Sequence, residues 1–71
     1  MKIISWNVNS VNTRLEHLLH MLQNVKPDFV CLQEIKCENA RFPVEQITDL
    51  GYCVAISGMK SYNGVAIISK H

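Results

Sequence analysis

The first half of the chain contains a short apolar run, then a segment with apolar residues at helical spacing, and then a second apolar run. The first apolar run, residues 2–6, predicts a buried strand, and an asparagine-rich polar turn follows it. Apolar side chains then recur at helical spacing on one face: Leu15, Leu18, Leu19, Leu22 and Val25. The Thr13-x-x-Glu16 form of a capping box predicts a helix start near Thr13, and Pro27 is expected to end that helix.

The second apolar run, residues 29–33, predicts a strand that is apolar on both faces, as in a parallel sheet covered on both sides. Strand, helix and strand in this order predict a right-handed βαβ unit. Both parallel strands then end at the same edge of the sheet, where ligands bind in open α/β folds. We therefore expect Asn7 and Glu34, which follow the two runs, to emerge side by side.

The second half of the chain predicts a short helix and two more strands. Residues 36–43 are a polar loop, and Pro43 is expected to open a helix over residues 44–50 with Gly51 at its C-terminal cap. Residues 52–57 and 65–69 predict strands too close together for a crossover, hence antiparallel, with positive φ at Asn63-Gly64. One long helix leaves a face of this sheet bare, which indicates part of a larger domain.

Composition narrows the class of protein. The 71 residues make at most one small domain, 48% of them are hydrophobic, and the net charge of +1 favours no particular partner. No apolar stretch is long enough to span a bilayer, and no signal-peptide pattern is present, so we expect no membrane association and a cytoplasmic location. The three cysteines lack C-x-x-C spacing, which argues against disulfides and zinc; Cys31 and Cys53 are expected to be buried thiols.

Glu34 is the main candidate for chemistry, because a carboxylate at a strand end can hold a divalent ion. The alternative is a solvated glutamate paired with Lys36. Asn7 could orient a phosphate oxygen or a metal-bound water through its amide, whereas Asn7 and Asn9 could equally serve only the turn, where asparagine is favoured. Position alone leaves these alternatives open.

The segments together resemble the N-terminal part of the exonuclease III family of AP endonucleases, within the endonuclease/exonuclease/phosphatase superfamily. Order and spacing agree along essentially the whole chain. The matching segments are residues 4–11 (ISWNVNSV), 26–28 (KPD), 32–36 (LQEIK), 42–43 (FP), 50–52 (LGY) and 62–67 (YNGVAI).

The resemblance implies an α/β fold, with β-α-β followed by an antiparallel strand pair as the N-terminal part of a four-layered, DNase I-like sandwich. Residues 1–71 would be an incomplete portion of that domain. The implied activity is Mg²⁺-dependent (with Mn²⁺ as a substitute) hydrolysis of phosphodiesters in double-stranded DNA, at abasic sites and from 3′ ends, in base-excision repair. The implied catalytic and metal-binding residues are Glu34 and Asn7.

The residues that the resemblance places near DNA are Asn9, Arg14, Lys36 and Tyr62. Relatives commonly carry arginine where this chain has Asn12. They are also several times longer, and their remaining catalytic groups (a tyrosine, an Asp-x-Asn motif and an Asp-His pair) have no counterpart here. Three interpretations therefore stay open. The chain is a segment of a nuclease completed by the missing C-terminal part, or an inactive remnant, or it belongs to a different class: a relative acting on RNA, inositol phosphate or lipid, or a non-catalytic binding module. We expect the isolated chain to be inactive.

Overall fold

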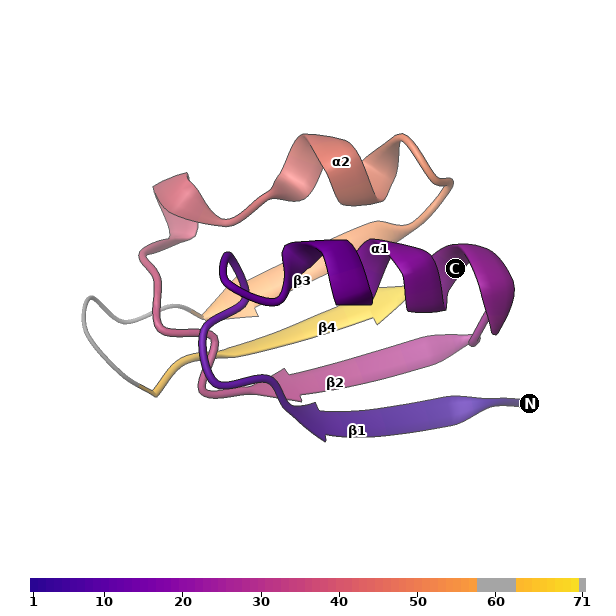
Figure 1. The fold of residues 1–71 in the computed structure, drawn as a ribbon, viewed down its shortest axis with the longest axis horizontal. Helices are drawn as coiled ribbons and strands as arrows, with labels where there is room; N and C mark the ends of the chain where they lie inside the picture. The colour runs from indigo at the N-terminus through magenta and orange to yellow at the C-terminus, as the bar shows by residue number, and fades with distance from the viewer. Residues whose placement is uncertain (58–62, 71) are drawn as a thin grey trace.

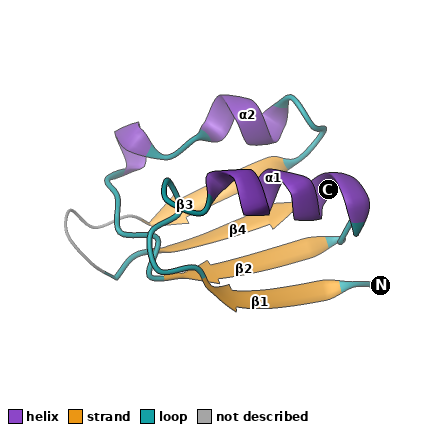
Figure 2. Ribbon diagram, in the orientation of Figure 1, coloured by secondary structure: helices purple, strands orange, loops and turns teal. Residues whose placement is uncertain are grey.

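The computed structural model describes residues 1–57 and 63–70. Its elements are β1 (Ile3–Asn7), α1 (Leu15–Asn24), β2 (Phe29–Gln33), a 3-10 turn η1 (Asn39–Arg41), α2 (Val44–Thr48), β3 (Cys53–Ser57) and β4 (Val65–Ser69). The predicted order of strands and helices is therefore confirmed, and element ends differ from the prediction by up to three residues. Figure 1 follows the chain through these elements, and Figure 2 separates helices from strands.

The strands form one sheet in the order β1-β2-β4-β3. β1 and β2 are parallel, with Asn7 opposite Gln33, as the βαβ prediction requires. β4 runs antiparallel to both β2 and β3, and Gln33 also lies opposite Val65. The ends of β1 and β2 and the start of β4 thus meet at one edge of the sheet, called here the carboxyl edge.

Helix α1 begins without the predicted capping box. Its N-cap residue is Arg14, and no side chain bonds to the free backbone amides there. The Thr13 hydroxyl instead lies 3.0 Å from the Ser10 hydroxyl, because residues 11–14 form turns that precede the helix. The prediction of a Thr13 cap was therefore wrong, although the amphipathic stripe is correct: Leu18 and Leu22 are fully buried.

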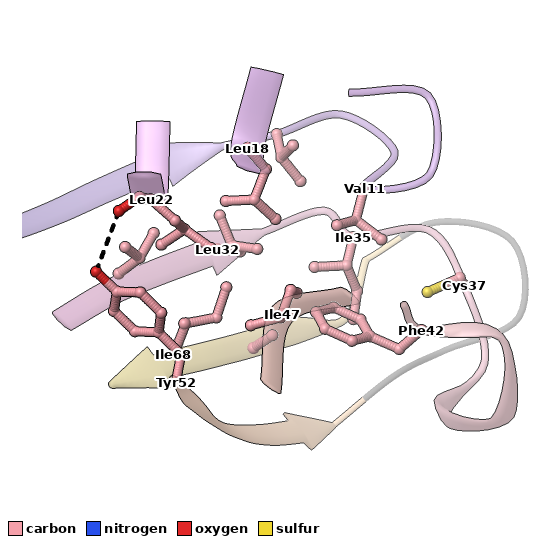
Figure 3. Packing of buried hydrophobic residues seen from close by; sticks show 13 residues of the cluster. Val11, Leu18, Leu22, Leu32, Ile35, Cys37, Phe42, Ile47, Tyr52 and Ile68 are labelled. Atoms are coloured by element: carbon pink, nitrogen blue, oxygen red, sulfur yellow. Dashed lines mark hydrogen bonds between the residues drawn. The ribbon is translucent and has the colours of Figure 1, made fainter. Parts of the chain in front are cut away.

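Both helices cover the same face of the sheet, and the core lies between them and the strands (Figures 1 and 3). Leu18 and Leu22 of α1 and Ile47 of α2 meet Leu32 and Ile68 of the central strands in one cluster of buried side chains. Tyr52 joins the layers: its hydroxyl donates to the carbonyl of Pro27 at 3.1 Å and to that of Leu22 at 3.4 Å. This packing holds the carboxyl edge in place from one side.

The opposite face of the sheet is uncovered within the described residues. Ile3, Val65 and Ile67 are 64%, 50% and 48% exposed there, although they are large and apolar. The expectation that β2 is covered on both sides was wrong for this chain, and the expectation of a bare face is confirmed. Cys53 also lies on this face and is exposed, contrary to the prediction of a buried thiol, because strand alternation turns it away from the helices. Cys31 is half-buried.

Within the described part of the chain, no helix is both long enough and apolar enough to cross a bilayer.

Candidate functional site at the carboxyl edge of the sheet

The structure brings Asn7 and Glu34 together, as the βαβ prediction requires. The Asn7 side-chain amide donates a hydrogen bond to Oε2 of Glu34. Asn7 is exposed and Glu34 is half-buried, so water and solutes reach the contact. One carboxylate and one side-chain amide therefore meet at the same point of the edge, with the amide nitrogen toward the carboxylate, and we call them the Asn7–Glu34 pair.

Glu34 reaches Asn7 because the backbone leaves the strand conformation at this residue. Its φ is +52°, in the left-handed region that costs a non-glycine residue about 1–2 kcal/mol. Regular alternation after the buried Leu32 would turn Glu34 toward the helices. The left-handed turn instead keeps Ile35 fully buried and leaves Glu34 at the edge, beside Asn7.

Left-handed residues gather at this edge of the sheet. Of the six non-glycine residues with positive φ that the structure describes, only Lys26 lies elsewhere. The others are Asn9, Ser10, Glu34, Lys36 and Asn63. Such strain persists only where the surroundings hold it, and it is frequent at functional sites.

Backbone hydrogen bonds hold the strained loops against one another. The amides of Val8 and Ser10 donate to the carbonyls of Gln33 (3.0 Å) and Glu34 (2.9 Å). From the other side, the amide of Lys36 donates to the carbonyl of Asn63 at 3.1 Å. Three loops from distant parts of the chain are thereby fixed around the Asn7–Glu34 pair. Positive φ at Asn63 and Gly64 was predicted and is confirmed.

Lys36 is tied to Asn9 rather than to Glu34. Its ammonium group donates a hydrogen bond to Oδ1 of Asn9, and no ion pair between Lys36 and Glu34 is found among the described contacts. The alternative of a glutamate neutralised by Lys36 is therefore not what the structure shows. Glu34 bonds to the Asn7 amide instead, and Lys36 lies two residues further along the chain.

A cleft of about 610 Å³ lies beside Lys36. Its walls are formed by Ser10, Asn12, Lys36, Cys37, Glu38 and Arg41. We call it the Arg41 cleft. Two of these residues are bonded to each other: the side-chain amide of Asn12 donates to the Arg41 carbonyl at 3.3 Å. Burial raises the pKa of the Cys37 thiol above its usual 9.0, so this cysteine stays protonated and unreactive at neutral pH.

The other predicted site residues lie apart from the pair or outside the described structure. Arg14 is half-buried at the start of α1 and does not line the Arg41 cleft. Tyr62 falls outside the described residues. The sequence pattern missed Ser10 and Glu38 as neighbours of the site. No periodicity in the sequence predicts their role, because they lie in loops that follow different strands and meet only in the folded structure.

Among the described residues, two side chains, rather than a cluster of three or more, are available at this edge to bind a metal ion. No group of three or more His, Cys, Asp or Glu side chains is close enough to hold a metal ion in the described parts of the chain. The carboxylate of Glu34 and the amide oxygen of Asn7 are the kind of donors that Mg²⁺ accepts together with water. They fit part of a magnesium site.

The chain matches a known protein family over nearly its whole length. Residues 4–71 match the model of the Endonuclease/Exonuclease/phosphatase family. Exodeoxyribonuclease III of Haemophilus influenzae is 40% identical over 70 residues, which are 99% of this chain and 26% of the relative. Recombination repair protein 1 of Drosophila melanogaster is also 40% identical, over 75 residues and 11% of its length.

Solved structures show the same likeness. The 3′ phosphatase NExo (D146N) from Neisseria, bound to product DNA hairpin, has a TM-score of 0.95 and 44% identity over 99% of this chain and 27% of that one. An AP endonuclease from Archaeoglobus fulgidus has a TM-score of 0.93 and 45% identity, again over 99% and 27%. The chain thus spans about a quarter of the length of the first relatives it matches. It belongs to the endonuclease/exonuclease/phosphatase family, and its α/β fold matches about a quarter of the DNase I-like fold of the solved AP endonuclease and NExo structures.

Proposed function

We propose that this chain supplies one half of the active site of a Mg²⁺-dependent nuclease that hydrolyses phosphodiesters of double-stranded DNA at abasic sites and 3′ ends. The observation that carries the proposal is the contact between Asn7 and Glu34 at the carboxyl edge of parallel strands. The names of the similar proteins, an exodeoxyribonuclease, an AP endonuclease and a 3′ phosphatase bound to DNA, support DNA as the substrate.

The residues of the pair have separate tasks in this proposal. Glu34 would hold Mg²⁺ (or Mn²⁺), and Asn7 would bind the same ion or a phosphate oxygen through its amide. When bound, the ion supplies Lewis-acid stabilisation of the charge that develops on the phosphoryl oxygens. Lys36 holds Asn9 in place beside the pair and adds a positive potential that attracts the phosphate backbone.

One carboxylate does not complete a hydrolytic site. The described residues hold no group of three or more His, Cys, Asp or Glu side chains that could complete a metal site around Glu34, and hydrolysis also needs a base that activates water. We therefore propose that the base and the remaining ligands come from the part of the domain that this chain does not include, and that the 71 residues alone do not cleave DNA.

A chimaeric enzyme tests the proposal. The 70 residues of this chain that match Haemophilus influenzae exodeoxyribonuclease III replace the matching quarter of that enzyme. The chimaera should cleave a duplex with an abasic site in Mg²⁺ and lose this activity in EDTA. Glu34→Gln should lower the cleavage rate at least about a hundredfold, because the carboxylate is lost from the metal site.

Glu45→Gln is the matched control, since Glu45 is exposed in the first turn of α2 and lies away from the edge. It should cleave at the rate of the parent chimaera. Full cleavage by Glu34→Gln would contradict the metal role. Hydrolysis of inositol phosphates or RNA by the chimaera, without cleavage of the abasic duplex, would instead favour a different phosphoester substrate.

A further inference from the structure

The Arg41 cleft carries a charge pattern that indicates a ligand of its own. We infer that it binds a backbone phosphate next to the one at the Asn7–Glu34 pair, and that Arg41 is the residue that positions this phosphate. The inference rests on the proposed function, which places a nucleic-acid strand at the carboxyl edge. It adds a second, separate contact point for that strand.

The charges of the cleft favour an anion, and Arg41 is its available cation. Lys36 and Arg41 are opposed by a single carboxylate, Glu38. The Lys36 ammonium group is already engaged with Asn9. In contrast, Arg41 is exposed, and within residues 1–57 and 63–70 its guanidinium group has no hydrogen-bond or ion-pair partner. A guanidinium group binds a phosphate through two parallel hydrogen bonds.

The backbone of Arg41 is held while its side chain stays exposed. Its amide donates to the Glu38 carbonyl at 2.9 Å, and its carbonyl accepts from the Asn12 side chain. The next residue, Phe42, is buried in the core. Arg41 thus stands on a fixed support, which lowers the entropic cost of ordering a ligand against it.

The Arg41 cleft and the Asn7–Glu34 pair are linked by neighbouring residues in the chain and by a hydrogen bond. Lys36 lines the cleft two residues after Glu34, and Ser10, which also lines it, donates its amide to the Glu34 carbonyl at 2.9 Å. The cleft therefore adjoins the loops that hold the Asn7–Glu34 pair, within reach of a nucleic-acid strand bound there. Contacts to phosphates fix the register of a nucleic acid without reading its sequence, so Arg41 acts as a positioning residue.

Binding and kinetics of an Arg41→Ala variant test this role. Binding of an abasic duplex is measured by fluorescence anisotropy on the 71-residue chain, and steady-state cleavage on the chimaera. Arg41→Ala should weaken binding and raise KM roughly tenfold, with kcat within about twofold, since a contact equal in ground and transition states affects KM alone. The slope of log affinity against log salt should fall by about one.

Arg41→Lys should recover part of the loss, and two duplexes of unrelated sequence should lose affinity equally. Lys70→Ala is the matched control, because Lys70 is an exposed cation at the opposite end of the sheet. If Arg41→Ala changes KM and the salt slope no more than Lys70→Ala, while Glu34→Gln abolishes cleavage, the inference is wrong and the proposed function stands. If Glu34→Gln cleaves normally, the proposed function fails first.

Discussion

At the scale of single residues, the Asn7–Glu34 pair combines one charged side chain with one neutral side chain. The amide of Asn7 donates to the carboxylate, so the two side chains attract each other without a cation. A second carboxylate in place of the amide would repel Glu34 until a divalent ion neutralised both groups. The response of an Asn7→Asp variant to a divalent ion therefore distinguishes a metal-binding pair from a hydrogen bond with only a structural role.

Asn7→Asp should therefore make stability depend on metal. In EDTA we expect the chimaera carrying Asn7→Asp to be less stable than its parent and to unfold at a lower temperature. The loss of unfolding free energy should be about 1 kcal/mol at most, because the pair is accessible to water. Added Mg²⁺ should raise its Tm more than that of the parent. Differential scanning fluorimetry with and without Mg²⁺ measures both effects. An equal response to Mg²⁺ in both proteins would argue against an ion at this pair.

At the scale of elements, Tyr52, which directly precedes β3, connects that strand to the end of α1. Its buried hydroxyl donates to the carbonyls of Pro27 and Leu22, and this link fixes where α1 ends above the sheet (Figure 3). Burial, and to a lesser degree the charge of Asp28, raise the pKa of Tyr52 above its usual 10.0. The folded protein therefore keeps the Tyr52 proton to higher pH than the unfolded chain does.

Tyr52→Phe should lower the free energy of unfolding by about 1 kcal/mol at neutral pH, because it removes the hydroxyl that serves two carbonyls. The raised pKa means that the unfolded chain ionises first, so stability falls as pH rises above about 10. Tyr52→Phe should lose less stability than the parent over this range. Urea unfolding at pH 7 and above pH 10 measures the difference. Cys37, whose pKa is also raised, is common to both proteins and cancels.

At the scale of the whole molecule, the uncovered face of the sheet is the dominant feature. Ile3, Val65 and Ile67 expose apolar surface on strands whose other face is packed. Apolar side chains exposed on one face of a sheet are typical of an interface or an aggregation site. In the four-layered fold that the family implies, a second sheet would cover it.

Ile67→Lys should improve the solution behaviour of the 71-residue chain and lower the stability of the chimaera. In the 71-residue chain we expect less aggregation, since a charge interrupts the exposed apolar strand. In the chimaera we expect a loss of at least about 2 kcal/mol, because the charge would be buried between sheets. Light scattering of the chain and urea unfolding of the chimaera give the two values. Val25→Lys is the control, on the helical side of the sheet where Val25 is 40% exposed, and it should leave the stability of the chimaera unchanged. If Ile67→Lys also leaves the stability of the chimaera unchanged, this face of the sheet is not covered there.

Much of the fold follows from local patterns in the sequence. Apolar runs, one amphipathic stripe and the Asn63-Gly64 turn predict strands and helices that the structure confirms within a few residues. The two strands of a βαβ unit are parallel, so β1 and β2 end at one edge of the sheet, and this is why the sequence predicted that Asn7 and Glu34 lie side by side. The Thr13 cap failed, because a capping motif competes with turns that tertiary contacts favour.

The sequence by itself determined the family, the order of the elements and the edge at which the candidate chemistry lies, since these depend on period, length and chain order. Only the tertiary structure decided how the edge is built. The left-handed turn at Glu34, the Lys36–Asn9 hydrogen bond and the Arg41 cleft each depend on loops that meet from distant parts of the chain. Unlike the Asn63-Gly64 turn, Glu34 carries no local pattern that predicts positive φ, because the surrounding hydrogen bonds, and not the residue type, make that conformation favourable there.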